Sequence, residues 1–407
     1  MEHMIKSLIE KNGTPFYLFD EKGFIDNYKA LESTFQKVYP NYKVSYSYKT
    51  NYTPFVCNLV KSLGGLAEVV SDMEYNLART LGYENSKIVY NGPSKGECMY
   101  EHLLGGGILN IDSLDEAKRI VTFCSEYPDK NFTVGIRINM DLGGDFISRF
   151  GLEPESEDLK ETVEILKLHE NIQIIGLHCH ISRSRGVEAW ARRAEIMLKA
   201  ADDIIEGVPQ YISLGSGMYA DMAEYLRNQF GGDAVPTYDD YCKACIQPIA
   251  DHYKNVDKKP TLYTEPGTTV VARYLSFISK VLSIKQIRGR WIANMDGDFH
   301  NLGEICTMKK LPTTVIPYGK LQKHYDKIDI MGFTCLEQDI MVPGWTGHLS
   351  EGDIVIFDNV GGYSIVSKPQ FIKPQSAMYA KRLDGSVQMI MRAETFDDVF
   401  NKFSFEF

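Results

Sequence analysis

Short runs of β-branched and aromatic residues alternate with amphipathic helical segments between about residues 40 and 270. A polar residue or a glycine follows each run, and several helical segments begin after Ser, Thr or Asp and end at Gly, as helices commonly do. This pattern predicts eight strands: Val44–Tyr48, Leu66–Val70, Lys87–Tyr90, Ile108–Ile111, Thr133–Ile138, Ile172–Leu177, Tyr211–Leu214 and Thr261–Thr264. Eight strands that alternate with helices are typical of an α/β protein with a (β/α)8 TIM-like barrel.

The pattern changes after residue 270, where strand-like segments are separated by Gly and Pro turns and little helix is expected. This pattern predicts a second domain built from strands, a β-sandwich or β-barrel. One further strand, Pro15–Phe19, precedes the predicted barrel. We therefore expect an N-terminal strand in residues 1–25 that joins the β domain, a barrel in residues 26–268, and the β domain itself in residues 269–407.

Composition narrows the classes of protein to consider. The 407 residues include 44 Lys and Arg against 54 Asp and Glu, so the net charge is −10, which disfavours nucleic acid and anionic membranes as partners. No apolar stretch approaches the roughly 18 residues of a membrane span, and the N-terminus lacks the apolar core of a secretory signal.

The eight cysteines are scattered, which predicts reduced thiols in a cytoplasmic protein. Cys242 and Cys245 form a C-x-x-C in a helical segment, but no second pair completes a metal site, so no metal is predicted.

Functional side chains gather where the predicted strands end. Barrels of this kind carry their chemistry at the carboxyl ends of the strands. The residues at those ends are Lys49, Ser71, Asn91, Asp112, Asn139, His178, His180, Gly215 and Glu265. The strand bodies before them are apolar, so the polar ends indicate a site at one rim of the barrel.

Two of these residues suggest pyridoxal 5'-phosphate (PLP). A lysine at the mouth of an apolar barrel is partly desolvated, which favours the neutral amine that forms a Schiff base, and Lys49 has this place. Glu265, in Glu-Pro-Gly, would pair with the pyridine nitrogen and keep the ring an electron sink. Each motif alone also fits a surface lysine or a simple turn.

Other motifs extend the hypothesis. Gly215-Ser216-Gly217 follows a strand and lets backbone N–H groups approach the cofactor phosphate. His178 and His180 alternate, so one of them is expected to face the barrel interior, where an imidazole would lie flat on the pyridine ring. Cys335 and Tyr363, in the predicted β domain, fit ordinary packing as well as a role in chemistry.

Taken together, these residues resemble the fold-type III PLP-dependent decarboxylases, the family of diaminopimelate, ornithine and carboxynorspermidine decarboxylases, whose fold is that of alanine racemase. The motifs run in the family's order from Thr14-Pro15-Phe16 to Tyr363. They include Tyr46-Ser47-Tyr48-Lys49-Thr50-Asn51, Glu68-Val69-Val70-Ser71, Ile136-Arg137-Ile138-Asn139, Ser148-Arg149-Phe150-Gly151, His178-Cys179-His180-Ile181, Glu265-Pro266-Gly267 and Cys335-Leu336-Glu337-Gln338-Asp339.

The resemblance implies a role for each matched residue. The implied cofactor contacts are Lys49, Arg137, His180, Gly215, Ser216, Gly217, Glu265, Gly267, Thr268 and Tyr363. Catalysis is implied for Lys49, His180 and Cys335, and substrate contacts for Arg149, Leu336 and Asp339. In the family the cysteine reaches across a dimer interface, so the resemblance also implies a homodimer with active sites at the interface.

The chain also departs from the family pattern. Thr268 stands where Glu-Pro-Gly is usually followed by arginine, and Leu336 where an acid reads the far end of the substrate. The arginine and tyrosine that hold the distal carboxylate of diaminopimelate are not recognisable, so its far end would need other contacts. The main hypothesis is a PLP-dependent amino-acid α-decarboxylase of amino-acid biosynthesis that releases CO2 from a diamino or carboxy-polyamine substrate. The alternatives are a carboxynorspermidine decarboxylase-type activity, an amino-acid racemase on the same fold, and a non-catalytic regulatory homologue.

Overall fold

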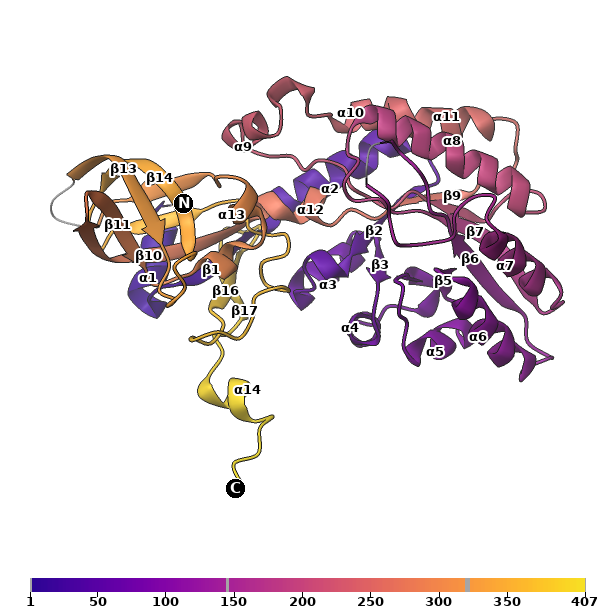
Figure 1. Ribbon diagram of the computed structural model, residues 1–407, viewed down its shortest axis with the longest axis horizontal. Coiled ribbons are helices and arrows are strands. Elements are labelled where there is room, and N and C mark those ends of the chain that lie inside the picture. Colours follow the sequence, from indigo (N-terminus) through magenta and orange to yellow (C-terminus); the bar gives the residue numbers. More distant parts are fainter. Residues whose placement is uncertain (1, 144–145, 319–322, 407) are drawn as a thin grey trace. The chain divides into compact units, whose positions relative to one another are not determined.

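The computed structural model describes residues 2–143, 146–318 and 323–406 (Figure 1). They form two compact units. The barrel unit comprises residues 28–219 and 235–269, and the β unit comprises the described residues of 1–27, 220–234 and 270–407. Unlike the predicted boundaries, which run without interruption from 26 to 268, this division groups residues 220–234 with the β unit.

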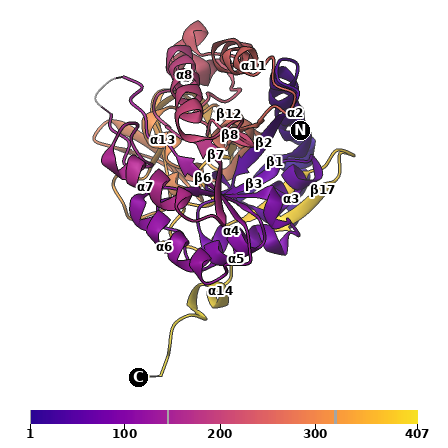
Figure 2. The ribbon, with the colours of Figure 1, turned by 90° about the vertical axis from the view of Figure 1, so that its right-hand side faces the viewer.

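Eight parallel strands close the barrel in sequence order, with the last strand paired to the first. The strands are β2 (Tyr42–Ser47), β3 (Leu66–Val69), β4 (Ile88–Tyr90), β5 (Ile108–Ile111), β6 (Phe132–Arg137), β7 (Ile172–His178), β8 (Tyr211–Ser213) and β9 (Thr261–Thr264). Figure 2 shows the barrel strands surrounded by helices. The predicted fold class, an α/β barrel with a separate strand-rich domain, is confirmed.

Helices of the barrel unit follow the strands, and serine caps begin three of them. Ser71, Ser113 and Ser156 each accept a hydrogen bond from the backbone N–H three residues later, which satisfies a donor that the first helical turn leaves unpaired. The helices are α3 (Pro54–Ser62), α4 (Asp72–Thr80), α5 (Cys98–Leu104), α6 (Leu114–Ser125), α7 (Glu157–Lys167), α8 (Val187–Ile204), α10 (Tyr238–Tyr241), a π-helical turn (Cys242–Ile246) and α11 (Gln247–His252). Short 3-10 turns lie at η1 (Tyr48–Thr50) and η2 (Asn85–Lys87).

One core cluster of the barrel unit joins strands β3, β4, β7, β8 and β9. It consists of the buried residues Leu66, Val89, Ile175, Tyr211 and Tyr263. Burial of side chains of this size is worth about 1.5–3 kcal/mol each, so this core fixes the strands whose ends carry the polar residues.

The β unit is built on a nine-stranded sheet in the order β14-β13-β11-β10-β1-β16-β17, with β15 paired to β10 and β12 paired to β15. The strands are β1 (Phe16–Asp20), β10 (Leu275–Ile287), β11 (Arg290–Met295), β12 (Thr313–Ile316), β13 (Lys323–Met331), β14 (Ile340–Leu349), β15 (Ile354–Phe357), β16 (Ala377–Lys381) and β17 (Val387–Met391). Strand β1 lies antiparallel to β10 and parallel to β16, so the N-terminal strand completes a sheet formed otherwise from residues beyond 274.

A helix that the sequence pattern did not predict, α1 (Glu2–Asn12), precedes β1. Its Ile5 and Leu8 pack against Phe16 and Leu18 of β1 in the core of the β unit. The other helical elements are α2 (Glu21–Gln36), which contains the boundary between the units, α9 (Glu224–Gln229), η3 (Gly232–Ala234), α12 (Thr268–Val271), η5 (Ala272–Tyr274), η6 (Phe299–Leu302), α13 (Ile305–Met308) and α14 (Phe396–Phe400). Over the described ranges, no helix has the length and hydropathy that crossing a membrane requires.

Candidate active site

Lys49 lies in η1, the turn directly after β2, where its amine meets a buried carboxylate. Its Nζ lies 2.5 Å from Oε2 of Glu68, which is 1% exposed on β3. The same Oε2 accepts a hydrogen bond of 2.6 Å from the Ser47 hydroxyl, and Oε1 accepts one of 3.1 Å from the Asn91 amide. A lysine held against a buried acid has a proton acceptor within reach, which is what a nucleophilic amine needs.

Glu265 lies on the same rim, directly after β9, and is 2% exposed. Its Oε1 accepts hydrogen bonds from the Asn91 amide at 3.1 Å and the Ser213 hydroxyl at 2.7 Å, and its Oε2 lies 3.0 Å from Nε2 of His178. Burial raises the pKa of Glu265, but the charge and hydrogen bond of His178, together with the charge of Lys49, outweigh it and hold the pKa well below its usual range. Glu265 is therefore a carboxylate, and Asn91 links it to Glu68.

Both histidines of the His-x-His motif contribute to this rim. Strand β7 ends at His178, and residues two positions apart in a strand face the same side, so the spacing places both rings at this rim rather than only one. Nδ1 of His180 accepts a hydrogen bond of 3.0 Å from the backbone N–H of Ser216, which leaves the proton of a neutral ring on Nε2. Burial, and then the charge of Lys49, lower the pKa of His180 well below its usual range, so this imidazole is neutral.

The loop Gly215-Ser216-Gly217 requires its glycines. Gly215 and Gly217 have φ of +59° and +105°. A Cβ on Gly215 would lie 2.3 Å from the carbonyl oxygen of Cys179, and one on Gly217 would lie 2.7 Å from that of Ile181. The Gly215 carbonyl accepts a hydrogen bond from the backbone N–H of Glu265, which ties this loop to the carboxylate at the end of β9.

Two backbone donors, one in this loop and one directly after it, find no partner among the described residues. Gly217 and Met218 donate no hydrogen bond to any residue that the structure describes. Unpaired N–H groups in a glycine-rich loop make an anion-binding concavity.

Arg137, at the end of β6, forms a buried ion pair with Asp112, with NH1 2.9 Å from Oδ1. Its guanidinium also lies over the Phe150 ring, 4.6 Å from the centroid, and Arg149 lies over the same ring at 4.3 Å. Arg149 itself is exposed. The Asn139 amide donates to the carbonyls of Ser148 and Phe150, at 2.8 and 2.6 Å, and so shapes the turn that carries Arg149.

Gly267 and Thr268 follow Glu265 around the rim. A Cβ on Gly267 would lie 1.9 Å from the Thr50 hydroxyl, so glycine lets this segment pack against the residue next to Lys49. The Ser47 N–H donates to the Pro266 carbonyl at 3.3 Å, which joins the first and last strand ends of the barrel. Thr268 is half-buried.

The remaining predicted site residues belong to the β unit. Cys335 is exposed and Leu336 half-buried. Asp339 is 1% exposed, and its oxygens accept hydrogen bonds from the backbone N–H groups of Phe299 and Thr334 and from the Thr334 hydroxyl. Asp339 therefore shapes the turn that carries Cys335. Tyr363, 37% exposed, has a φ of +55°, which is unusual for a tyrosine.

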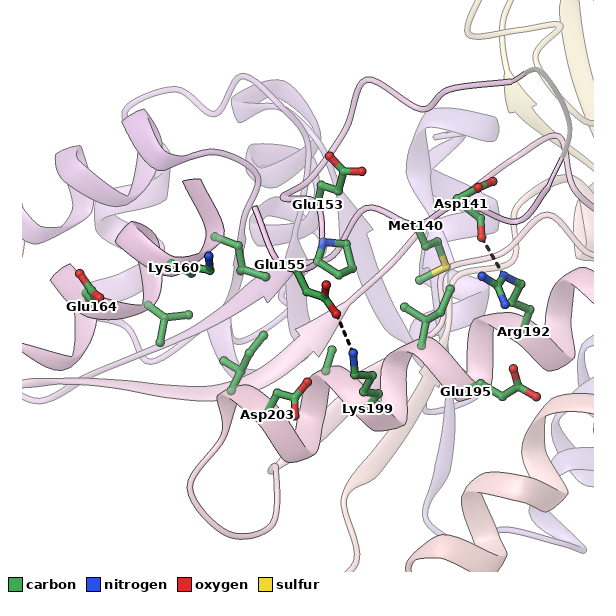
Figure 3. Close-up of a pocket in the computed structure, with 16 residues that line it drawn as sticks. Met140, Asp141, Glu153, Glu155, Lys160, Glu164, Arg192, Glu195, Lys199 and Asp203 are labelled. Carbon is green, nitrogen blue, oxygen red and sulfur yellow. Dashed lines mark hydrogen bonds and ion pairs between the residues drawn. The ribbon is translucent and has the colours of Figure 1, made fainter. Parts of the chain in front are cut away.

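The C-x-x-C cysteines and a separate cavity lie outside this rim. Cys242 and Cys245 are buried in the π-helical turn, and among the described residues no group of three or more His, Cys, Asp or Glu side chains is placed to hold a metal. A cavity of about 730 Å³ lies between α7 and α8 (Figure 3). An ion pair of 2.8 Å between Glu155 and Lys199 crosses it, and its lining contains none of the predicted site residues.

Glu74 is a second acid near Lys49 and Glu68. It is 4% exposed on α4, and its Oε2 accepts a hydrogen bond of 2.8 Å from the Val70 N–H. Burial, and then repulsion from the Glu68 carboxylate, raise the pKa of Glu74 to about 7. Glu74 therefore exchanges its proton near neutral pH.

Glu74→Gln should flatten the dependence of stability on pH. The pKa of Glu74 in the folded protein lies above its usual value of 4.5, so its stabilising contribution is complete below about pH 4.5 and is lost as the pH rises through about 7. Between about pH 5 and pH 8, the free energy of unfolding should fall by about 2–3 kcal/mol less in the variant than in the wild type. Urea unfolding at both pH values measures this difference. The exposed Glu84→Gln should behave as wild type, and an unchanged pH dependence in Glu74→Gln would contradict the assignment.

Several residues of this network were not assigned a role from the sequence. Glu68 stood out only as part of a family motif and Asn91 only as a strand-end residue. His178 was one of two histidines of which one was expected to face the barrel interior, and Ser213 did not stand out at all. Their shared signal is a polar side chain at or near the end of an otherwise apolar barrel strand.

The barrel residues fit PLP by the chemistry of their groups. Lys49 supplies an amine for the aldehyde, and Glu265 supplies a carboxylate for the pyridine nitrogen. Residues 217 and 218 supply N–H groups for a phosphate, which have no partner in the described part of the chain.

Comparisons with known proteins agree with this fit. The pyridoxal-binding domain of the pyridoxal-dependent decarboxylases matches residues 26–272. The diaminopimelate decarboxylase of Methanothermobacter thermautotrophicus is 24% identical over 414 residues, 96% of this chain and 92% of that protein. The L-glutamyl-(BtrI acyl-carrier protein) decarboxylase of Niallia circulans is 25% identical over 427 residues, 97% of this chain and 95% of that protein.

Solved structures of pyridoxal-dependent decarboxylases share this fold. A crystal structure of diaminopimelate decarboxylase from M. jannaschii superposes with a TM-score of 0.84 at 23% identity, covering 97% of this chain and 93% of that one. The family model covers more than half of the chain, and the network at the barrel rim supplies the groups that its cofactor needs. The chain therefore belongs to the pyridoxal-dependent decarboxylase family and is a PLP-dependent decarboxylase.

Proposed function

We propose that this enzyme removes the α-carboxylate of a diamino or carboxy-polyamine amino acid, with Lys49 as the residue that binds the cofactor covalently and Glu265 as the partner of its pyridine nitrogen. The observation that carries the proposal is the pair of buried carboxylates on one rim, one against the Lys49 amine at 2.5 Å and the other held ionised by His178. When bound, PLP withdraws the electron pair that the departing CO2 leaves on the α-carbon.

Lys49 has to lose a proton before it can attack an aldehyde. Oε2 of Glu68 lies 2.5 Å from its Nζ and can accept this proton, while Ser47 and Asn91 hold that carboxylate in place. The same contact can return the proton when a substrate amine displaces Lys49.

Glu265 has to keep its negative charge beside a protonated nitrogen. Ser213, Asn91 and His178 fix both of its oxygens. The groups that stabilise the negative charge therefore need not move during the reaction. His180 is neutral and is oriented by the Ser216 N–H, which suits a ring that packs flat on the cofactor without protonating it.

Arg137, Gly215, Ser216, Gly217, Gly267, Thr268 and Tyr363 complete the proposed cofactor contacts. Arg149, Leu336 and Asp339 complete the proposed substrate region. For Asp339 the proposed action is indirect, because its carboxylate is occupied in the Cys335 turn.

The active enzyme is proposed to be a homodimer, with Cys335 of one subunit donating the proton to the α-carbon in the site of the other. The exposure of Cys335 on a turn that a buried Asp339 braces supports this role, since a donor to a second chain has to be accessible. The eight free cysteines support a cytoplasmic location, where thiols stay reduced.

The substrate is proposed from the relatives and from Leu336. The relatives include proteins named for diaminopimelate and for a glutamyl group on a carrier protein, so the family accepts different distal ends. An apolar Leu336 in place of an acid gives no partner, at that position, to the terminal ammonium group of lysine or ornithine. A carboxynorspermidine decarboxylase-type activity is the second candidate, because the pairing of Cys335-Leu336 with a residue other than arginine at position 268 resembles that branch of the family.

CO2 release from a substrate panel tests this proposal. The panel contains diaminopimelate, a carboxy-polyamine, lysine and ornithine. We expect kcat/KM for lysine and ornithine to lie about 10-fold or more below that for the best substrate, the scale of one missing charged contact. Efficient decarboxylation of either would contradict the reading of Leu336. Exchange of the α-hydrogen without CO2 release would indicate a racemase, and a purified protein without PLP would indicate a regulatory homologue.

A further inference from the structure

A buried arginine on α8 binds the two loops that form one side of the cofactor site. Arg193 is 0% exposed, and its guanidinium donates only to backbone carbonyls: NH1 to Leu214 at 2.8 Å and to Ser216 at 2.9 Å, and NH2 to Ile181 at 3.1 Å. Its two arms therefore join the loop after β7, which carries His180, to the glycine loop after β8.

Arg193 differs from the other buried cations in having no carboxylate partner. Among the described residues, three lysine or arginine side chains are buried, and the other two form ion pairs, Lys95 with Glu116 and Arg137 with Asp112. No carboxylate of the described chain lies within ion-pair distance of Arg193, and its Nε has no hydrogen-bond partner there. Glu265 acts on it only through space.

The surroundings of Arg193 do not remove its charge. Its guanidinium lies over the Trp190 ring at 4.3 Å from the centroid, which favours a cation, and arginine keeps its proton in proteins. Buried charges are normally paired. Because the hydrogen-bond partners of Arg193 in the described chain are neutral, we expect a bound anion to compensate its charge.

The loop that Arg193 binds is where an anion would find donors. The carbonyls of Leu214 and Ser216 point to the guanidinium, and the next N–H groups, of Gly217 and Met218, have no partner among the described residues. The segment after Glu265 adds no cation, since residue 268 is threonine.

We propose that Arg193 is a positioning residue for the cofactor phosphate: it holds the glycine loop through the carbonyls of Leu214 and Ser216, ties it to the His180 loop through that of Ile181, and supplies the positive charge behind it. The inference rests on the proposed assignment of residues 215–217 to the phosphate. It predicts that Arg193 determines how strongly the protein prefers PLP to pyridoxal, the same aldehyde without the phosphate.

Equilibrium binding of both aldehydes to the apoenzyme tests this inference. Arg193→Met should weaken PLP binding about 10- to 100-fold, the range expected for lost contacts to a charged group, and pyridoxal binding by less than about 3-fold. Arg193→Lys keeps the positive charge but loses the planar guanidinium that donates to several carbonyls at once, and should retain part of the preference for PLP over pyridoxal. The matched control is Arg192→Met, an exposed arginine one residue away on the same helix, which should leave both affinities unchanged. Circular dichroism of each variant verifies folding.

Equal weakening of both aldehydes, or no weakening, would show that Arg193 acts only in folding or not at all. If Arg193→Met does not fold, Arg193→Lys decides, since an unchanged preference in a folded variant with altered fork geometry overturns the proposal.

A Gly217→Ala variant tests the phosphate assignment on which this inference rests. Its Cβ would crowd the Ile181 carbonyl and so disturb the glycine loop without changing Arg193. If Gly217→Ala loses the preference for PLP and Arg193→Met keeps it, the glycine loop binds phosphate without help from Arg193. If neither variant changes the preference, the phosphate assignment is wrong as well.

Discussion

Lys49→Ala should lower kcat by about four orders of magnitude or more and abolish the visible absorption of lysine-bound cofactor, because it removes the covalent attachment. Both effects have one physical origin. Lys49 lies in a turn directly after β2, with Glu68 placed to accept its proton, and the described structure offers no second amine in that position.

Activity assays and absorption spectra of the purified variant measure this prediction. The matched control is Lys43→Ala, a half-buried lysine of β2, the strand before Lys49, that takes no part in the network, which should retain activity within about twofold. A Lys49→Ala enzyme with wild-type spectrum and turnover would remove the basis for the whole site assignment.

Glu265→Gln should lower kcat by about 10²- to 10³-fold while the protein still binds PLP, because the amide keeps the size of the side chain and loses its charge. The preorganised negative charge is what a protonated pyridine nitrogen needs, and Ser213, Asn91 and His178 hold it in place. Glu265→Asp keeps the charge at a shorter reach and should be less impaired.

The pH dependence of the Glu265→Gln effect gives a second check. The pKa of Glu265 lies well below its usual range, so its carboxylate is ionised throughout the neutral region. The ratio of wild-type to variant kcat should therefore stay constant between about pH 6 and pH 9. A variant as active as the wild type, or a ratio that collapses within this range, would contradict the proposed role.

The sequence pattern predicted the barrel because the signals are local. Each barrel strand is a short β-branched or aromatic run that ends at a polar residue, and serine caps such as Ser71 and Ser113 mark where the next helix begins. The α1 helix was missed because its few apolar positions, such as Ile5 and Leu8, gain their burial only from β1 and its sheet neighbours.

The site network was predicted only in part because it depends on contacts across the barrel. Asn91 reaches Glu265 over 174 positions of sequence, and His178 reaches it over 87. No periodicity encodes which of these polar groups meet, since barrel closure and side-chain length decide it. The spacing of His178 and His180 also places both rings on one face, because residues two apart in a strand share a face, so the expectation of a single interior ring was not what alternation predicts.

The place of Arg193 on its helix is visible in the sequence. The buried face of α8 is otherwise apolar, with Trp190, Ala194, Met197 and Ala201, so an arginine in that stripe is a polar residue at a core position. Such a residue indicates a buried partner, but the partners here are carbonyls of loops that the helix pattern does not describe.

The most direct test of the central claim is to reduce the holoenzyme with borohydride and locate the pyridoxyl group by peptide mass mapping. A single modified residue, Lys49, is expected, because its amine lies on the rim with Glu68 and Glu265. Lys95 is the informative competitor, since it is fully buried, unlike the half-buried Lys49, and is occupied by Glu116 and the Gly92 carbonyl. Label on Lys95 or on any other lysine, or no label on a protein that decarboxylates amino acids, would contradict the account.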